Sequence, residues 1–296
     1  MSLAAPNPFP RRRGLAPPRA VREAIAQLDA KRDALRIVQL LLSEEFPFDM
    51  LRATELALFH TFGSRSISTL LDRTGQFERH GQKRYDDTRL LIGHILECGL
   101  DDETGARALA RMNRIHSHYR IPNDDYLFVL WTFIDFPIRW LAEFGHRPMT
   151  PHEQLAWFNC WVRIGERMGL RDLPQDKASL DVFVEAYEQR EFVPCAASRR
   201  VADATVRVLQ AWLPRPLRWL VPPLVSCLMR PRLRAALGHA APPRWLLAVV
   251  RATLKVRGVV KRVFSLEKYP SVMADVLNRT YPGNRYDIDA LGPERH

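Results

Sequence analysis

A long apolar stretch in the middle of the chain sets the strongest limit on the fold. Residues 126–144 read YLFVLWTFIDFPIRWLAEF and are apolar nearly all the way round a helix, which is typical of a helix surrounded by other elements. Pro122 and the acids of NDDY just before it mark a helix start. Elsewhere apolar residues recur at helical spacing, with no convincing alternating strand and no Asn-Gly or Asp-Gly hairpin signal. We therefore predict an all-α protein, a single large helical domain around a central apolar helix.

Prolines, glycines and capping residues divide the rest of the chain into further helices. Gly75 predicts a turn and Gly99 a helix C-cap. We predict helices near 18–43, 51–60, 64–71, 82–98, 101–120, 151–168, 179–192 and 266–279. Since no internal repeat or sharp boundary occurs, residues 18–296 are predicted to form one domain after a flexible, Pro- and Arg-rich N-terminus at 1–17.

The positive charge is concentrated in one segment. The 296-residue chain has a formal charge of +11, yet residues 199–262 alone hold fourteen Lys or Arg against the single acid Asp203. Tryptophans and leucines interleave with these arginines, a composition that favours an anionic membrane surface over nucleic acid, which also rewards clustered arginine. A third interpretation is that the apolar residues are core and the arginines its solvated face.

Targeting and redox signals point to the cytoplasm. The N-terminal arginines are not followed by the apolar run of a secretory signal. Residues 219–229, WLVPPLVSCLM, are too few for a bilayer-spanning helix and contain two prolines. The four cysteines are far apart and form no CxxC pair, which indicates a reducing compartment. We expect a cytoplasmic, peripherally membrane-associated protein that is not secreted.

The stretch RMNRIHSHYRIPNDDY at 111–126 is unusually rich in imidazole and guanidinium groups. His116 and His118 are two apart and point to nearly opposite sides of a helix, so they cannot both hold one metal. His116 shares a face with Asn113 and Arg120. One imidazole without acidic or cysteine partners suits haem better than zinc, and Arg120 could then pair with a propionate. From spacing alone, a structural histidine favoured by the helix dipole is the commoner interpretation.

A second motif, KRYDDTRLL at 83–91, places Arg84 and Thr88 four residues apart on one face. Facing an apolar cavity, they could orient oxygen or a substrate carbonyl; facing solvent, they would belong to an ordinary charge cluster. The sequence has no GxSxG elbow, phosphate-binding glycine loop, HExxH or dinucleotide fingerprint, so hydrolase, kinase and Rossmann interpretations are not supported.

Five motifs in order resemble a known family. They are LLDRTGQF, KRYDDTRLLIGHI, MNRIHSHYRIPNDDYLFVLWTF, LMRPRLRAALG and RTYPGNRYDIDALGP, between about residues 46 and 293. The sequence resembles the family that joins rubber oxygenases (latex-clearing proteins) to MpaB-like endoplasmic-reticulum-bound oxygenases, and is more similar to the MpaB-like branch. The resemblance implies an all-helical fold, and the rubber oxygenases bind one b-type haem through a proximal histidine.

The resemblance assigns roles to the residues of both motifs. It implies that His116 is the iron ligand, with Asn113 and Arg120 beside the haem, and that Arg84 and Thr88 line the distal, catalytic side. Asp87 stands where the rubber oxygenases have a lysine, so a lysine cannot cap the iron from that position. An apolar substrate tunnel is expected to draw on Phe128, Trp131, Phe133, Phe136 and Trp157.

The resulting hypothesis is a haem b-dependent oxygenase that oxidises or cleaves a hydrophobic, terpenoid or prenylated, substrate with dioxygen at a membrane surface through 199–262. Nucleic acid is not favoured as a partner. One alternative is a non-enzymatic, all-α peripheral membrane or nucleic-acid-binding protein. Another is a haem protein with a sensing or peroxidase-like role.

Overall fold

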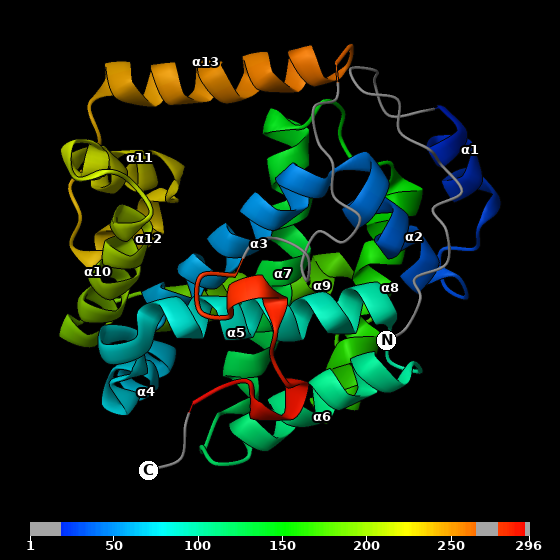
Figure 1. Ribbon diagram of the computed structural model, residues 1–296, viewed down its shortest axis with the longest axis horizontal. Helices are drawn as coiled ribbons and strands as arrows, with labels where there is room; N and C mark the ends of the chain where they lie inside the picture. Colours follow the sequence, from blue (N-terminus) through cyan, green and yellow to red (C-terminus); the bar gives the residue numbers. More distant parts are fainter. Residues whose placement is uncertain (1–18, 265–277, 294–296) are drawn as a thin grey trace.

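The computed structural model describes residues 19–264 and 278–293 and is built from helices, with no strand in these ranges (Figure 1). The predicted all-α class is confirmed. The predicted N-terminus at 1–17 and nearly all of the helix predicted at 266–279 lie outside the described residues. The elements are α1 Arg19–Gln27, α2 Ala34–Leu40, the π-helix η1 Leu41–Glu45, α3 Pro47–His60, η2 Thr61–Gly63, α4 Arg65–Thr74, α5 Gln76–Cys98, α6 Glu103–His116, α7 Asn123–Phe144, α8 Pro151–Arg167, α9 Lys177–Glu191, α10 Ala196–Ala211, η3 Arg215–Leu220, α11 Val221–Leu228, α12 Pro231–Leu237, α13 Arg244–Lys261, η4 Pro282–Asn284 and η5 Ile288–Ala290.

Helix α7 is the centre of the molecule, as its apolar sequence predicts. It packs against α3, α8, α9 and α13, and buried side chains point to all its sides, including Phe128, Ile134 and Leu141. Figure 1 shows it crossing behind α5 between the two halves of the bundle. A helix that is apolar all round can be stable only when it is enclosed in this way.

Helices α5 and α6 form an antiparallel hairpin that determines where the candidate site residues lie. Gly99 ends α5 with φ 92°, a left-handed conformation that glycine adopts without strain. Gly105 lies so close to it that a Cβ atom there would come within 1.8 Å of the Gly99 carbonyl oxygen. Counting back from this tight turn, the last residue of α6, His116, lies beside the first half of α5, where Arg84 and Thr88 are found.

Several predicted helix boundaries are wrong, among them the start of α3, which lies at Pro47 rather than near residue 51. The helix predicted at 18–43 breaks between α1 and α2, because the Asp29 side chain accepts hydrogen bonds from the Lys31 and Arg32 backbone amides and stabilises a turn. Helix α5 starts at Gln76 rather than near residue 82, directly after Gly75, with non-helical angles at His80. Helix α6 ends at His116 rather than near residue 120.

The basic segment forms the peripheral part of the fold. Helices α10, α11 and α12 lie together at one side, and α13 extends from them along the edge of the molecule (Figure 1). Helix α13 packs on α7 and α11, and Gly258 permits this contact because a Cβ there would lie 2.6 Å from the Phe144 carbonyl oxygen. Much of the rest of α13 is exposed.

A C-terminal segment, residues 278–293, packs on the outside of the α5–α6 hairpin. Thr280 donates to Asp86 from both its amide and its hydroxyl, and Arg111 of α6 donates to the Leu291 carbonyl at 2.6 Å. The His94 ring and the Tyr286 hydroxyl lie 2.8 Å apart. These contacts fasten a segment without long helices to the hairpin that carries the candidate site.

Candidate functional site

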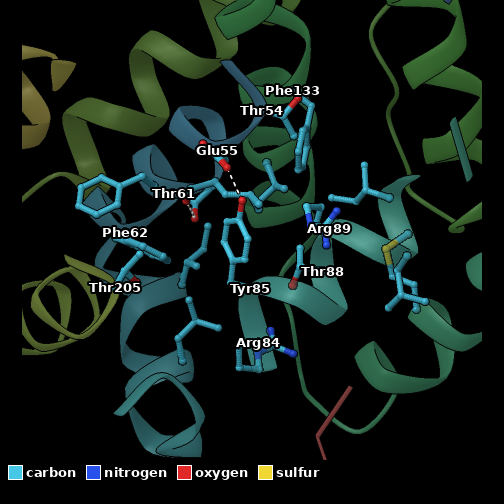
Figure 2. Close-up of a pocket in the computed structure, with 18 of the residues that line it drawn as sticks. Thr54, Glu55, Thr61, Phe62, Arg84, Tyr85, Thr88, Arg89, Phe133 and Thr205 are labelled. Atoms are coloured by element: carbon cyan, nitrogen blue, oxygen red, sulfur yellow. Dashed lines mark hydrogen bonds between the residues drawn. The ribbon is translucent and has the colours of Figure 1, made fainter. Parts of the chain in front are cut away.

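A cavity of about 500 Å³ lies between the hairpin and the rest of the bundle. Its wall is formed by α3, α4, α5, α6, α7, α8, α10 and α11, together with Pro293 of the C-terminal segment. Most lining side chains are apolar, and Figure 2 labels several of the polar ones, among them Glu55, Arg84 and Thr88. A cavity of this size with few polar groups suits a small, largely apolar molecule or an organic cofactor.

His116 lies on the wall of this cavity at the end of α6. Its ring packs edge-on against Tyr126 with centroids 5.6 Å apart, and its buried Nδ1 atom has no hydrogen-bond partner among the described residues. Burial, with a smaller effect from the positive charge of Arg84, lowers the pKa of His116 to about 4. The imidazole is therefore neutral at pH 7, which is the form that binds a metal.

Arg84 and Thr88 line the same cavity from α5. No described residue accepts a hydrogen bond from the Arg84 guanidinium, whose carbon lies 5.6 Å from the centre of the Phe77 ring. Burial lowers the pKa of Arg84 despite the opposing effect of Asp87. The Thr88 hydroxyl also makes no hydrogen bond to a described residue. The fold thus brings three of the predicted residues, His116, Arg84 and Thr88, to one apolar space with their polar atoms available.

Asn113 and Arg120 are not brought to this cavity. The Asn113 side chain donates to the Arg167 carbonyl at 3.2 Å, and Arg120 is exposed. Because α6 ends at His116, the expected i, i+4 relation between His116 and Arg120 does not exist. Their assignment beside a haem stays a prediction.

Asp87, at the position of the rubber-oxygenase lysine, is not among the residues that line the cavity. It is buried and accepts hydrogen bonds from the Lys83 ammonium, the Tyr281 hydroxyl and the Gly292 amide at 2.8, 2.6 and 2.9 Å. Lys83 also donates to the Gly292 carbonyl at 2.7 Å. The departure from the motif thus has a structural explanation: this acid anchors the C-terminal segment.

The predicted aromatic tunnel is largely wrong. Of its five residues, only Phe133 lines the cavity. Trp157 is fully buried in the core and donates to the Phe133 carbonyl at 3.0 Å. Phe128 stacks on Tyr187 with ring centroids 4.5 Å apart. Aromatic residues on a central helix are buried whether or not a cavity lies beside it.

Several polar lining residues were not predicted from the sequence, and three of them lie together. Arg52 and Glu55 come from α3 and Tyr85 from α5. Arg52 and Glu55 are three apart and oppositely charged, a spacing typical of exposed ion pairs on helices, so their pattern gave no sign of a cavity. Tyr85 directly follows Arg84 and was within the quoted motif, but its ring faces a different side of α5.

No group of three or more His, Cys, Asp or Glu side chains able to hold a metal ion occurs in the part of the chain that the structure describes. Haem does not need such a group, because its porphyrin supplies four ligands and the protein only one or two. A single neutral imidazole on the wall of an apolar cavity meets that requirement.

Comparisons with known proteins identify the family of the chain. The family model of the ER-bound oxygenase mpaB/B′ and rubber oxygenase catalytic domain matches residues 50–258. An ER-bound oxygenase mpaB′ of Penicillium brevicompactum is 32% identical over 262 residues, which are 82% of this chain and 62% of that protein. An ER-bound oxygenase mpaB of Penicillium roqueforti (strain FM164) is 32% identical over 234 residues, 73% of this chain and 78% of that protein. The matched region contains the α5–α6 hairpin and the cavity-lining parts of α7, α8, α10 and α11. The chain therefore belongs to the family of ER-bound oxygenase mpaB/B′ and rubber oxygenase catalytic domains.

Proposed function

We propose that the protein is a haem b-dependent oxygenase that oxidises or cleaves a hydrophobic, terpenoid or prenylated, substrate with dioxygen. The observation that carries the proposal is the imidazole of His116 on the wall of an apolar cavity of about 500 Å³, with no hydrogen-bond partner for its buried Nδ1 atom among the described residues. Family membership supplies the oxygenase chemistry. The chain spans 62% of the length of the mpaB′ relative, so its activity is proposed here from its own residues.

The residues present fit a haem. His116 would ligate the iron, and its lowered pKa keeps the nitrogen lone pair available across the physiological pH range. When bound, haem would supply the capacity to bind and reduce dioxygen, as haem enzymes do. The unpaired Arg84 guanidinium matches a group that carries negative charge.

The chain's own residues would position the reactants. Arg84 and Thr88 are hydrogen-bond donors without partners on the cavity wall, and they would orient dioxygen or a substrate carbonyl. The apolar lining would desolvate the substrate and exclude water. Asn113 and Arg120 lie outside the cavity lining, and a pairing of Arg120 with a haem propionate stays part of the proposal.

An absorption spectrum of the purified protein tests the cofactor. After expression with ample haem precursor, we expect a Soret band and near-stoichiometric haem b in a pyridine haemochrome assay. His116→Ala should abolish the band, while His118→Ala, which changes an exposed histidine two residues away, should retain it. A colourless protein that also refuses added haemin would refute the haem assignment. Oxygen uptake with an isoprenoid substrate then separates an oxygenase from a haem sensor or carrier.

We also propose that the basic segment rests on a membrane. Its outer surface exposes large apolar side chains: Trp219 and Trp245 are 70% and 68% exposed, and Val249, Val256, Val259 and Phe264 are also exposed. Exposed cations, including Arg215, Arg244 and Lys255, accompany them. Apolar side chains interleaved with cations are typical of helices that lie in a membrane interface. No helix in the described ranges is long and apolar enough to span a bilayer.

Other arginines of the segment have partners inside the protein. Arg230 pairs with the buried Asp135, and Arg232 with Glu185 and Glu188. Arg234 donates to the Ser226 and Met229 carbonyls. These three stabilise the fold, so membrane attraction must come from the exposed cations.

Vesicle flotation tests the membrane contact. On phosphatidylcholine vesicles with phosphatidylserine, the combined change Trp219→Ser and Trp245→Ser should weaken binding strongly, because it removes two large interfacial side chains. Val182→Ser, which changes a 75% exposed valine on α9, is the matched control and should bind as the wild type does. Changing Arg215, Arg244 and Lys255 to Gln should weaken the free energy of binding to the vesicles by about 1 kcal/mol for each residue that lies near the anionic surface. Equal binding by all variants would refute this surface.

A further inference from the structure

A second polar cluster lies in the cavity, on the α3 side. The Tyr85 hydroxyl donates a hydrogen bond to Glu55 Oε1, and the Arg52 guanidinium lies 2.8 Å from the same oxygen. Figure 2 shows the Tyr85 side chain directed toward Glu55, with Thr88 and Arg84 on the other side of the view. The cavity thus has one polar group near α3 and another at Arg84, whose charge influences His116.

Part of this cluster is left without a partner. Tyr85 and Arg52 both contact Oε1, and no described residue donates to Glu55 Oε2. No described residue accepts a hydrogen bond of acceptable geometry from the Arg52 guanidinium. The side chains of Arg52 and Glu55 are 32% and 22% exposed, so a ligand in the cavity can reach them. An acceptor and a donor are therefore available side by side in a largely apolar space.

The charges of the pair decide which ligand group fits. A carboxylate or phosphate would be repelled by Glu55, and an amine by Arg52. A neutral group that both donates and accepts would satisfy both residues. Burial, only partly offset by the charge of Arg52, the hydrogen bond from Tyr85 and the charge of Arg89, raises the pKa of Glu55.

We propose that Arg52 and Glu55, with Tyr85 holding Glu55 in place, recognise a hydroxyl group at one end of an otherwise apolar substrate. The ligand hydroxyl donates to Glu55 Oε2, and its oxygen accepts from Arg52. The apolar remainder then extends along the cavity toward Thr88 and His116. This inference rests on the proposed function, since it names the substrate class of the same cavity: an apolar alcohol or phenol rather than a plain hydrocarbon.

Calorimetric titration of the full chain with a matched pair of ligands tests the inference. Geraniol and geranyl methyl ether share the same apolar chain, but only the alcohol can donate a hydrogen bond. We expect the wild-type protein to bind the alcohol about tenfold more tightly, as a hydrogen bond to a charged group implies. Glu55→Gln should reduce the preference to within about twofold, because the amide places a donor where an acceptor is needed.

A second variant and a control guard against misfolding. Arg52→Gln should weaken the binding of both ligands, because the oxygen of each accepts from Arg52, while Glu78→Gln, which changes a 64% exposed acid at the start of α5, should change neither the affinity nor the preference. Equal affinity of the wild-type protein for the two ligands, no binding of geraniol, or an unchanged preference in a folded Glu55→Gln protein would each overturn the inference.

The absorption spectrum of the same samples separates the two proposals. A protein with a haem band that treats the alcohol and the ether alike refutes hydroxyl recognition and leaves the oxygenase proposal standing. A colourless protein that still prefers the alcohol refutes the haem proposal and leaves the recognition site standing.

Discussion

Two faces of helix α5 carry polar side chains in very different situations. On the face toward the C-terminal segment, Asp86 and Asp87 are buried and accept hydrogen bonds from Gln82, Lys83, Thr280, Tyr281 and Gly292. On the cavity face, Arg84 and Thr88 have no hydrogen-bond partner among the described residues. The four residues fall within one and a half turns of a single helix.

The difference separates structural polar groups from functional ones. Buried polar groups are nearly always hydrogen-bonded, so those without partners call for an explanation. Asp86 and Asp87 use their hydrogen-bonding capacity to hold the fold together. Arg84 and Thr88, which are half-buried, keep theirs available to a ligand in the cavity. Four substitutions would test this division, in decreasing order of expected effect.

Asp87→Ala should be the most destabilising. It removes the acceptor of three hydrogen bonds and leaves the Lys83 ammonium without its carboxylate partner. We expect the free energy of unfolding in urea to fall by about 3–5 kcal/mol. Glu78→Ala, which breaks an exposed pair with Arg207, should cost no more than about 1 kcal/mol. A small effect of Asp87→Ala would show that the C-terminal segment is held by other contacts.

Asp135→Asn extends the test to a satisfied carboxylate on another helix. Burial raises the pKa of Asp135, but ion pairs with Arg230, Arg139 and Lys177 outweigh burial and hold it below its usual 3.8. The folded state therefore binds this proton less readily than the unfolded state, and the stabilisation is present above pH 3.8 and lost as the pH falls below it. The free energy of unfolding of the variant at pH 7 should be about 2 kcal/mol lower than that of the wild type. Its stability should also decline less steeply than that of the wild type below pH 4, as measured by urea unfolding.

Arg84→Met should leave the ligand-free protein as stable as the wild type, or more stable by about 1 kcal/mol. Methionine has a similar length, and the change removes a half-buried charge that no carboxylate contacts. Urea unfolding of haem-free protein measures this. Marked destabilisation would place Arg84 with the structural groups and break the comparison.

Thr88→Val should have the smallest effect and should change the free energy of unfolding by no more than about 0.5 kcal/mol in either direction. The side chains have nearly the same shape, and the threonine hydroxyl has no partner to lose. Thr280→Val on the other face is the matched change, since that hydroxyl donates to Asp86 at 2.6 Å. If the two variants lose equal stability, the hydroxyls on the two faces of α5 contribute equally and the comparison fails.

The sequence was informative where one local pattern determines the structure. The apolar run of α7 allows only a central helix, and Gly99 ends α5 where glycine is needed. Together with the spacing of the two motifs, these features place His116 beside Arg84 and Thr88. The family resemblance is confirmed by the match over residues 50–258.

What the sequence could not show depends on partners far away in the chain. Arg230 was expected at the membrane, but its partner Asp135 lies 95 residues earlier. The Arg52 and Glu55 pair has the spacing of a surface pair, and only the packing of α3 against its neighbours turns it toward a cavity. The early end of α6 likewise removed Arg120 from the face it was expected to share with His116.

The long reach of the C-terminal segment has a consequence for biosynthesis. The contact from Asp86 to Thr280 joins residues 194 positions apart, and Pro293 completes the cavity wall. At about 5–20 residues per second, a ribosome needs roughly 10–40 seconds between making the two. During that interval the nascent hairpin would keep its local partners Gln82 and Lys83 but would lack the donors of the C-terminal segment and Pro293 on the cavity wall. A chain interrupted before residue 278 would therefore lack the donors that hold Asp86 and Asp87 and would lack Pro293 on the cavity wall.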